Sequence, residues 1–200
     1  MHYLDWGNHG APVIVCAHGL TSHAHAFDGL ARRCGGRFHV VSLDVRGRGD
    51  SAWSPLGEYT MAAYAADLAA FVDALGLTRF TLVGTSMGGR ISMHYAANHP
   101  DRLERLVLND IGPDSEAGSA RITAVGASRP SSFASLDEAV TYRAHTVPAM
   151  AKALAEAQRE AALYVLRQRP DGHWVWKHDP AIDQQRARDG AQGYPELWRA

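Results

Sequence analysis

Short runs of apolar residues recur along the first half of the chain, and each one ends at a glycine or an aspartate. Four of them span Pro12–Gly19, Phe38–Gly47, Arg79–Gly84 and Leu103–Asp110. A continuous apolar run of this length, closed by a turn residue, is typical of a strand that is buried on both faces of a parallel sheet. A shorter run at residues 2–7 predicts one further strand at the edge of that sheet.

Helical periodicity fills the spaces between these runs. One apolar stripe repeats at helical spacing and consists of Tyr64, Leu68, Phe71, Val72 and Leu75. Thr60 is a suitable N-cap for this helix and Gly76 a suitable stop. A second helix is predicted from just after Ser86 to about Asn98, because Pro100 follows. Strands that alternate with helices predict an α/β fold with a doubly wound, mostly parallel sheet, which binds ligands beyond the carboxyl ends of its strands.

The second half of the chain shows a different pattern. From residue 113 to about 190 we find helical periodicity and no clear parallel strand. Ser135 is a candidate N-cap for one helix, and residues 149–168 predict a longer amphipathic helix. Residues 172–179 predict a short extended piece. This change of pattern separates a core, residues 1–112, from a mostly helical segment.

A candidate nucleophile stands where the third apolar run gives way to a helix. Ser86 lies between Gly84 and Gly88, and glycine–x–serine–x–glycine between a strand and a helix is the signature of a serine on a tight turn. Glycines at these positions remove side chains where strand and helix crowd the turn. A serine hydroxyl attacks a carbonyl effectively only when a base takes its proton and donors stabilise the oxyanion that forms.

Two backbone N–H groups are expected to supply those donors. The N–H of Met87 lies at the positive end of the new helix. The second donor is expected in the loop after the first apolar run, with Leu20 as the candidate because Gly19 permits the required backbone bend. The sequence therefore predicts an oxyanion hole made of Leu20 and Met87.

Four stretches of the sequence occur in an order that resembles the α/β-hydrolase fold superfamily. They are CAHGLTSH, LDVRGRGDS, GTSMGG and LVLNDIGP, and the resemblance covers about residues 3–112. They look like the members that cleave esters and carbon–carbon bonds, since the members that hydrolyse epoxides or haloalkanes carry aspartate where this chain has Ser86. The resemblance implies a partial α/β-hydrolase core, strands 2 to 6 of the superfamily in the spatial order 2-4-3-5-6, over residues 1–112. It further implies a helical lid or cap over residues 113–190 and a return segment toward further core strands at residues 191–200.

The resemblance also implies where the remaining site residues lie. His18, Gly19 and Trp53 are expected at the substrate, and Asp44 is expected in a loop that braces the rim of the site. In this superfamily the acid and then the histidine follow the serine along the chain. Asp110 is the one candidate acid, and a simple turn residue is the alternative.

None of the eleven histidines has the sequence context of a triad base. The superfamily places that histidine after a last strand, for which the pattern offers no candidate. We therefore expect an incomplete α/β hydrolase whose base lies outside these 200 residues.

The composition of the chain limits the kinds of molecule that it is expected to bind. Charged residues make up 20% of the chain and the net charge is −1, which favours neither nucleic acid nor an anionic membrane. Two cysteines, Cys16 and Cys34, and no recognisable leader predict a reduced, cytoplasmic protein. We expect a small-molecule substrate with no cofactor and no metal, since His23 and His25 lack a cysteine or carboxylate cluster beside them. We also expect self-association through the open edge of the strand at residues 103–110.

Three functions remain open. The first is a serine hydrolase of small carboxylic esters, thioesters or lactones that works through a Ser86 acyl-enzyme. The second is a carbon–carbon bond hydrolase that uses the same fold and the same serine, and assays on an aryl ester and a dienone acid would separate these two. The third is a chain without turnover, either a binding module or a fragment that lacks the triad histidine.

Overall fold

A computed structural model describes residues 1–112, 129–147 and 151–189 of the chain. The strands, in chain order, are β1 (Tyr3–Asp5), β2 (Val13–Ala17), β3 (His39–Leu43), β4 (Phe80–Thr85), β5 (Leu103–Asn109), β6 (Ser132–Phe133), β7 (Leu166–Gln168) and β8 (Trp174–Trp176). The helices are α1 (Asp28–Cys34), α2 (Met61–Ala74), α3 (Met87–Asn98), α5 (Leu136–Thr146), α7 (Ala155–Val165) and α8 (Pro180–Asp189), with short 3₁₀ turns at Ala24–Phe27 and Pro100–Arg102.

Five strands form one twisted sheet in the order β1-β3-β2-β4-β5. Strands β2 to β5 run parallel, and β1 joins β3 antiparallel at one edge. Val15 in the centre of β2 lies opposite Val41 of β3 and Leu82 of β4. With the strands numbered as in the superfamily, this order is 2-4-3-5-6, so the predicted sheet is confirmed.

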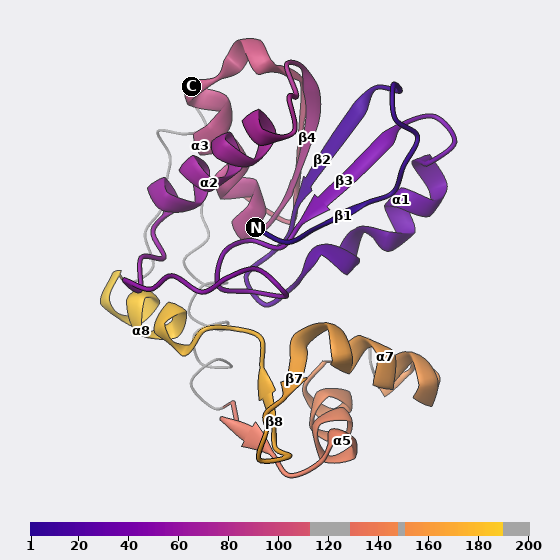
Figure 1. Ribbon diagram of the computed structural model, residues 1–200, viewed down its shortest axis with the longest axis vertical. Coiled ribbons are helices and arrows are strands. Elements are labelled where there is room, and N and C mark those ends of the chain that lie inside the picture. Colours follow the sequence, from indigo (N-terminus) through magenta and orange to yellow (C-terminus); the bar gives the residue numbers. More distant parts are fainter. Residues whose placement is uncertain (113–128, 148–150, 190–200) are drawn as a thin grey trace.

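Helices cover both faces of this sheet (Figure 1). One layer of the core joins the sheet to α2 and α3 and includes Leu68, Phe80, Leu82 and Ile91. The other, smaller layer joins it to α1. The predicted cap of α2 is confirmed, because the Thr60 side chain accepts a hydrogen bond from the N–H of Ala63.

The second half combines helices with a small sheet, and the extended piece predicted at residues 172–179 is confirmed as its central strand, β8. Strands β6, β8 and β7 form a three-stranded antiparallel sheet beside α5 and α7. The helix predicted over residues 149–168 runs only over Ala155–Val165, and residues 148–150 lie outside the described residues. The helical periodicity continues into β7, but there the chain pairs with β8, whose tryptophans Trp174 and Trp176 favour a strand. We call the part from Ser132 to Trp176 the cap.

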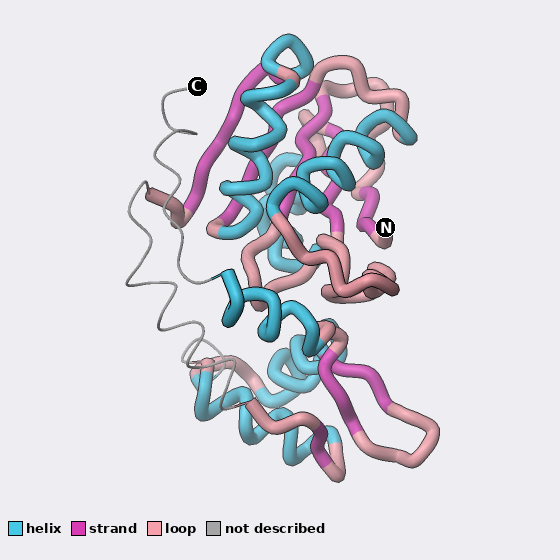
Figure 2. Tube along the Cα trace, turned by 90° about the vertical axis from the view of Figure 1, so that its left-hand side faces the viewer, coloured by secondary structure: helices cyan, strands magenta, loops and turns pink. Residues whose placement is uncertain are grey.

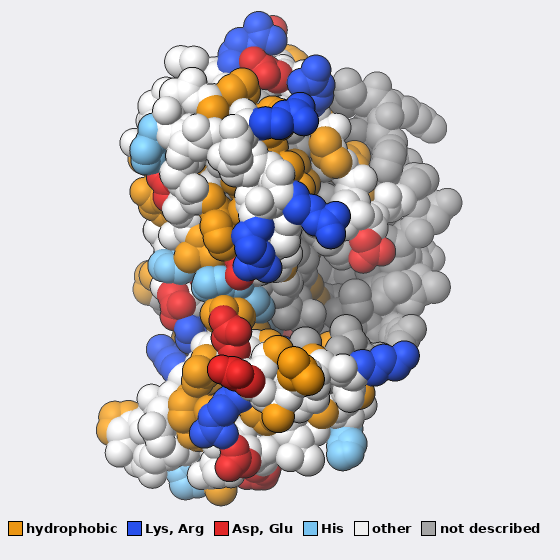
Figure 3. Space-filling model, turned by 90° about the vertical axis from the view of Figure 1, so that its right-hand side faces the viewer, with side chains coloured by type: hydrophobic (Ala, Val, Ile, Leu, Met, Phe, Trp, Pro, Cys, Tyr) orange, Lys and Arg blue, Asp and Glu red, His pale blue; other side chains and the backbone are white. Residues whose placement is uncertain are grey.

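The cap lies against the loops that follow β2 and β3 (Figures 1 and 2). The Tyr164 ring of α7 stacks on the His25 ring, with ring centroids 3.9 Å apart. Just after the cap, Lys177 forms an ion pair of 2.7 Å with Asp50, and the N–H of Asp179 donates to the carbonyl of Gly47. Histidine side chains lie along this seam in Figure 3. These loops stand at the carboxyl ends of the strands, where the sheet is expected to bind its ligand.

The expected boundaries at residues 113 and 190 meet segments outside the described residues, as does the return segment at 191–200, so they stay predictions. None of the helices in the described part of the chain combines the length and the apolar character needed to cross a bilayer.

Candidate active site around Ser86

Ser86 occupies a sharp turn between β4 and α3. Its φ of 51° and ψ of −114° lie in a backbone region that residues other than glycine rarely adopt. The turn is held in place by a hydrogen bond of 2.9 Å from the N–H of Ser86 to the carbonyl of Asn109 on β5. The tight turn expected at Ser86 is therefore present, and its strained backbone is that of a nucleophile elbow, the turn that exposes a catalytic serine between a strand and a helix.

Close packing explains the glycines on both sides of Ser86. A Cβ on Gly88 would collide with the carbonyl of Ala17 at the end of β2. A Cβ on Gly84 would lie 2.5 Å from the carbonyl oxygen of Gly88, and one on Gly89 would lie 2.9 Å from the side chain of Ile111. Each glycine lets one backbone segment approach another, so the motif is a requirement of packing as well as of chemistry.

The loop after β2 reaches the serine at Gly19. A Cβ on this residue would lie 3.5 Å from the Cβ of Ser86. The Gly19 carbonyl accepts a hydrogen bond of 2.6 Å from Nδ1 of His18. In a trans peptide the carbonyl and the next N–H point in opposite directions, so the N–H of Leu20 is directed away from His18. That N–H has no backbone acceptor among the described residues.

The other expected donor begins a helix. Met87 is the first residue of α3. The N–H groups of a first helical turn have no acceptor within the helix, and they carry the positive end of its dipole. The N–H groups of Leu20 and Met87 thus belong to the two segments that meet at Ser86.

His18 is a structural part of this loop. Its ring is fully buried, Nδ1 donates to Gly19, and Nε2 accepts a hydrogen bond of 3.0 Å from the N–H of Val45. Burial and, to a smaller extent, the nearby charge of Arg48 lower the pKa of His18 to about 4. With both nitrogens engaged, the neutral ring braces the loop beside Ser86, and its expected place at the substrate stays a prediction.

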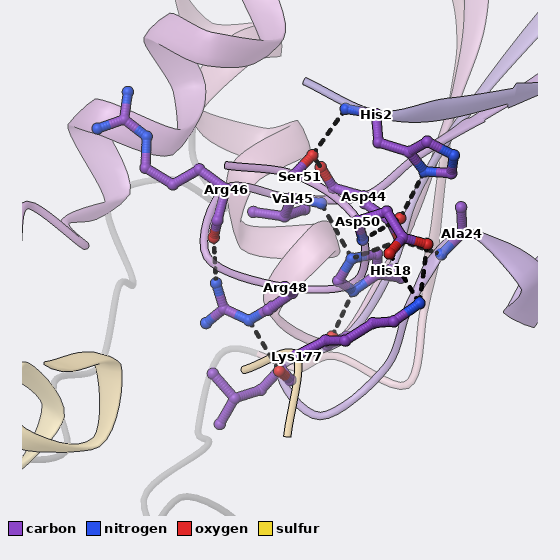
Figure 4. A network of polar contacts seen from close by, with 12 residues as sticks. His2, His18, Ala24, Asp44, Val45, Arg46, Arg48, Asp50, Ser51 and Lys177 are labelled. Carbon is purple, nitrogen blue, oxygen red and sulfur yellow. Dashed lines mark hydrogen bonds and ion pairs between the residues drawn. The ribbon is translucent and has the colours of Figure 1, made fainter. Parts of the chain in front are cut away.

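Asp44 binds several segments together (Figure 4). Its Oδ1 accepts from the N–H of Ala24 at 2.7 Å, and its Oδ2 accepts from the N–H of Asp50 at 3.0 Å. Nδ1 of His2 lies 2.7 Å from the same Oδ2. Burial alone would raise the pKa of Asp44, but these hydrogen bonds lower it overall. The carboxylate therefore braces the rim, as expected, with His2 as a partner that no sequence signal indicated.

Arg48 is a second residue that the sequence did not single out. Only 2% of its surface is exposed. Its Nε donates to the carbonyl of Leu20 at 2.8 Å, and Nη1 donates to the carbonyl of Arg46 and the hydroxyl of Tyr64. The buried guanidinium fixes the peptide that follows the Leu20 N–H. The alternation of arginine and glycine at residues 46–49 was the one available signal, and it did not show which arginine is buried.

Comparison with known proteins agrees with this geometry. A profile described as the alpha/beta hydrolase fold matches residues 12–173. The chain belongs to the α/β-hydrolase family.

Individual relatives agree with this assignment. The chain is 32% identical, over its whole length and 71% of the relative, to a 3-hydroxybutyrate-oligomer hydrolase of Cupriavidus necator. It resembles the solved structure of an alpha/beta hydrolase from Novosphingobium aromaticivorans, with a TM-score of 0.77 and 31% identity over 90% of this chain and 65% of that one. The structure of an E-2-(acetamidomethylene)succinate hydrolase gives a TM-score of 0.81 and 29% identity, over 95% of this chain and 69% of that one.

Trp53 of this hydrolase lies at the junction of core and cap. Its Nε1 donates to the carbonyl of Lys177, and the guanidinium of Arg167 lies 4.9 Å from the centre of its ring. A cavity of about 400 Å³ adjoins it and is lined by Gly49, Asp50, Ser51, Ala52, Trp53, Arg167 and Lys177. Ser86 is not among the residues that line this cavity, and the expected place of Trp53 at the substrate stays a prediction.

The proton-transfer side of the hydrolase site is less complete. All eleven histidines lie in the described residues, and none of them hydrogen-bonds the Ser86 hydroxyl. His178, whose side chain is largely buried, lies after the cap, and its Nε2 is 3.4 Å from Oδ2 of Asp183 in α8. Asp110 follows β5 with a φ of 54°, and its side chain is exposed and makes no hydrogen bond within the described part of the chain. The structure therefore assembles Gly19, Leu20, Ser86 and Met87 and leaves Asp110 without a partner histidine.

Proposed function

We propose that this chain carries the acylation site of a serine hydrolase of small carboxylic esters, thioesters or lactones. The observation that supports this proposal most strongly is the strained turn at Ser86, which has a φ of 51° and lies close to Gly19 in the loop after β2. A relative that matches the whole chain is named a 3-hydroxybutyrate-oligomer hydrolase, and since ester bonds join the units of such oligomers, this supports ester cleavage as the reaction.

The proposed reaction begins with attack of Ser86 Oγ on the ester carbonyl carbon. The carbonyl oxygen becomes an oxyanion, which accepts hydrogen bonds from the N–H groups of Leu20 and Met87. A base takes the serine proton and returns it to the leaving alcohol, and water then hydrolyses the acyl-enzyme. Gly19 lets the substrate approach the loop, and Trp53, in the loop after β3, is assigned to bind the substrate beside the cap.

Asp110 is retained as the acid that would orient the base. Its place directly after β5, next to the residue that accepts the Ser86 N–H, supports this role. We assign the base to none of the eleven histidines, since none of them hydrogen-bonds the Ser86 hydroxyl within the described part of the chain. We therefore propose that full turnover requires a base that the described residues do not place at Ser86.

A chain without turnover is the second candidate, and the unaccompanied Ser86 hydroxyl favours it. Loss of triad members removes several orders of magnitude of rate and leaves only binding and oxyanion stabilisation. Under this candidate the fold keeps a pocket and the chain acts by binding.

A fluorophosphonate probe and a panel of aryl esters test the proposal. We expect slow labelling that Ser86→Ala abolishes. Ser92→Ala is the matched control, because Ser92 lies on the same helix and its buried hydroxyl donates to the Gly88 carbonyl. Equal labelling of the wild type and Ser86→Ala would refute the proposal. Hydrolysis of a dienone acid in preference to every ester would instead assign carbon–carbon cleavage.

Self-association through β5 is part of the proposal. Within the described residues β5 pairs only with β4, and its Leu106 and Val107 are 37% and 44% exposed. An open apolar edge is a template for strand addition. Sedimentation should show a concentration-dependent oligomer that Val107→Lys weakens, whereas a monomer at all concentrations would exclude it.

We also propose a cytoplasmic location. The free thiols of Cys16 and Cys34 support it, because disulfides are rare in that compartment.

A further inference from the structure

Two histidines and an aspartate gather at the edge of the sheet opposite the serine. Asp5 is the last residue of β1, and His39 is the first residue of β3. Because β3 and β4 run parallel in this sheet, the beginning of β3 lies at the end away from Ser86, which follows β4. The two elements bring together residues that are separated by 34 positions in the sequence.

A tight turn adds His9 to this pair. Gly7, Asn8 and Gly10 all have positive φ angles, of 72°, 63° and 90°, and the N–H of Ala11 donates to the carbonyl of Asn8. The chain thereby folds back so that the His9 ring meets the His39 ring edge to face, with centroids 4.6 Å apart.

The donor atoms of the three side chains are close enough to share one ion. Nε2 of His39 lies 2.8 Å from Oδ1 of Asp5, and one donor atom from each residue lies within 4.8 Å of the other two. In a tetrahedral zinc site, ligand atoms at about 2.1 Å from the metal are roughly 3.4 Å apart. Small side-chain adjustments around the exposed His9 and Asp5 reach that geometry.

The chemistry of this donor set selects the class of ion. Two imidazole nitrogens and one carboxylate oxygen suit zinc and its first-row neighbours, whereas magnesium and calcium prefer oxygen ligands throughout. The N–H of Gly7 also donates to Oδ1 of Asp5 at 2.8 Å, which orients the carboxylate toward the histidines. Such support from outside the ligand set is typical of metal sites.

A second group of similar composition is less suitable. His2, Asp44 and Asp50 also lie within reach of one another. Both oxygens of Asp44 already accept backbone N–H groups, and Asp50 forms an ion pair with Lys177. The Asp5, His9 and His39 group carries no comparable competition beyond its own Asp5–His39 contact and the Gly7 N–H.

We propose that Asp5, His9 and His39 form a binding site for a divalent transition metal of the zinc class, with its remaining position open to water. The ion would join the turn after β1 to the start of β3 and so secure the antiparallel edge strand on the sheet. It would stand at the edge of the sheet remote from Ser86 and take no part in hydrolysis.

Metal titration of the 200-residue chain, freed of metal by a chelator, tests this site. Zinc binding is followed by equilibrium dialysis, with cobalt absorption as a second readout. The wild type should hold one zinc ion more tightly than His9→Ala and Asp5→Asn, by roughly tenfold or more. His173→Ala is the matched control, since the exposed His173 lies 3.6 Å from Asp171 in a turn without a second histidine.

The thermal unfolding midpoint gives an independent measurement. Zinc should raise it in the wild type and in His173→Ala, because an ion that binds only the folded state stabilises it, and should leave it unchanged in His9→Ala. His9→Gln, which keeps the turn polar, should behave like His9→Ala. Equal zinc affinity in the wild type and both His9 variants, or tighter binding of magnesium than of zinc, would overturn the proposal and leave an ordinary Asp–His pair.

Discussion

The two loops that flank Ser86 are held in very different ways. On one side, the carbonyls of Gly19 and Leu20 are fixed by His18 and by Arg48. Both of these side chains are buried, and Asp44 binds the next part of the same loop through the N–H of Ala24. This side is preorganised before any substrate arrives.

Asp110, which follows β5 on the other side of Ser86, has no hydrogen-bond partner among the described residues. It adopts a left-handed backbone conformation and is exposed. This difference between the two sides of Ser86 corresponds to two tasks of a serine hydrolase, stabilising the oxyanion and taking the serine proton. The chain places groups suited to stabilising an oxyanion, and it places no histidine where a proton must be taken. Substitutions on the two sides should therefore have unequal effects.

The largest effect is expected where the braced side meets the elbow. Gly88→Ala places a methyl group against the carbonyl of Ala17, and backbone on both sides leaves it nowhere to move. We expect a loss of about 4 kcal/mol or more in the free energy of unfolding, measured by denaturant titration. Gly36→Ala is the control, since nothing lies within 4 Å of its Cβ position. Similar stability of the two variants would show that the elbow is loosely packed.

Arg48→Met should produce the next largest effect. It keeps an apolar stem but removes the donors to the carbonyls of Leu20 and Arg46 and to the hydroxyl of Tyr64. We expect about 3 kcal/mol of destabilisation, because the partners are left unsatisfied. Fluorophosphonate labelling of Ser86 should slow roughly tenfold as the Leu20 peptide loosens. An unchanged labelling rate in a folded variant would argue against positioning of the loop by Arg48.

Acid should weaken the braced side. Burial lowers the pKa of His18 to about 4, from 6.5, so the unfolded state binds more protons between these two pH values. The stability that the neutral ring contributes is complete above pH 6.5 and is lost as the pH falls toward 4, by on the order of 3 kcal/mol.

Denaturant titrations at several pH values measure how steeply the free energy of unfolding changes with pH. In His18→Gln the slope between pH 6.5 and 4 should flatten, while the exposed His145→Gln should keep the slope of the wild type. Parallel curves for all three proteins would show that His18 does not titrate in this window.

The smallest effect is expected at Asp110. Asn tolerates the same left-handed backbone and removes only the charge, so Asp110→Asn should change stability by less than about 0.5 kcal/mol. Labelling of Ser86 by the 200-residue chain should change little, since no histidine contacts this carboxylate. A large loss of labelling would reveal a base that reaches Asp110 and Ser86 in solution.

The sequence alone determined the features that depend on neighbouring residues. The buried strands followed from continuous apolar runs, the cap of α2 followed from Thr60, and the turn at Ser86 followed from glycines that leave room for it. Even the order of the sheet was accessible, because the motifs resemble those of a known superfamily. The same reasoning failed in the cap, where pairing with β8 outweighed the local helical preference at Leu166–Gln168.

Only the tertiary structure decided which polar side chains bear the site. His2 reaches Asp44 across 42 residues, and Arg48 is buried while Arg46 pairs with Asp67 near the surface. No local pattern distinguishes two arginines that are separated by a single glycine. Burial and hydrogen bonding between distant segments arise only when the strands pack. For that reason only the folded chain shows which side chains hold the Gly19–Leu20 loop. It alone also shows that no histidine hydrogen-bonds Ser86 among the described residues.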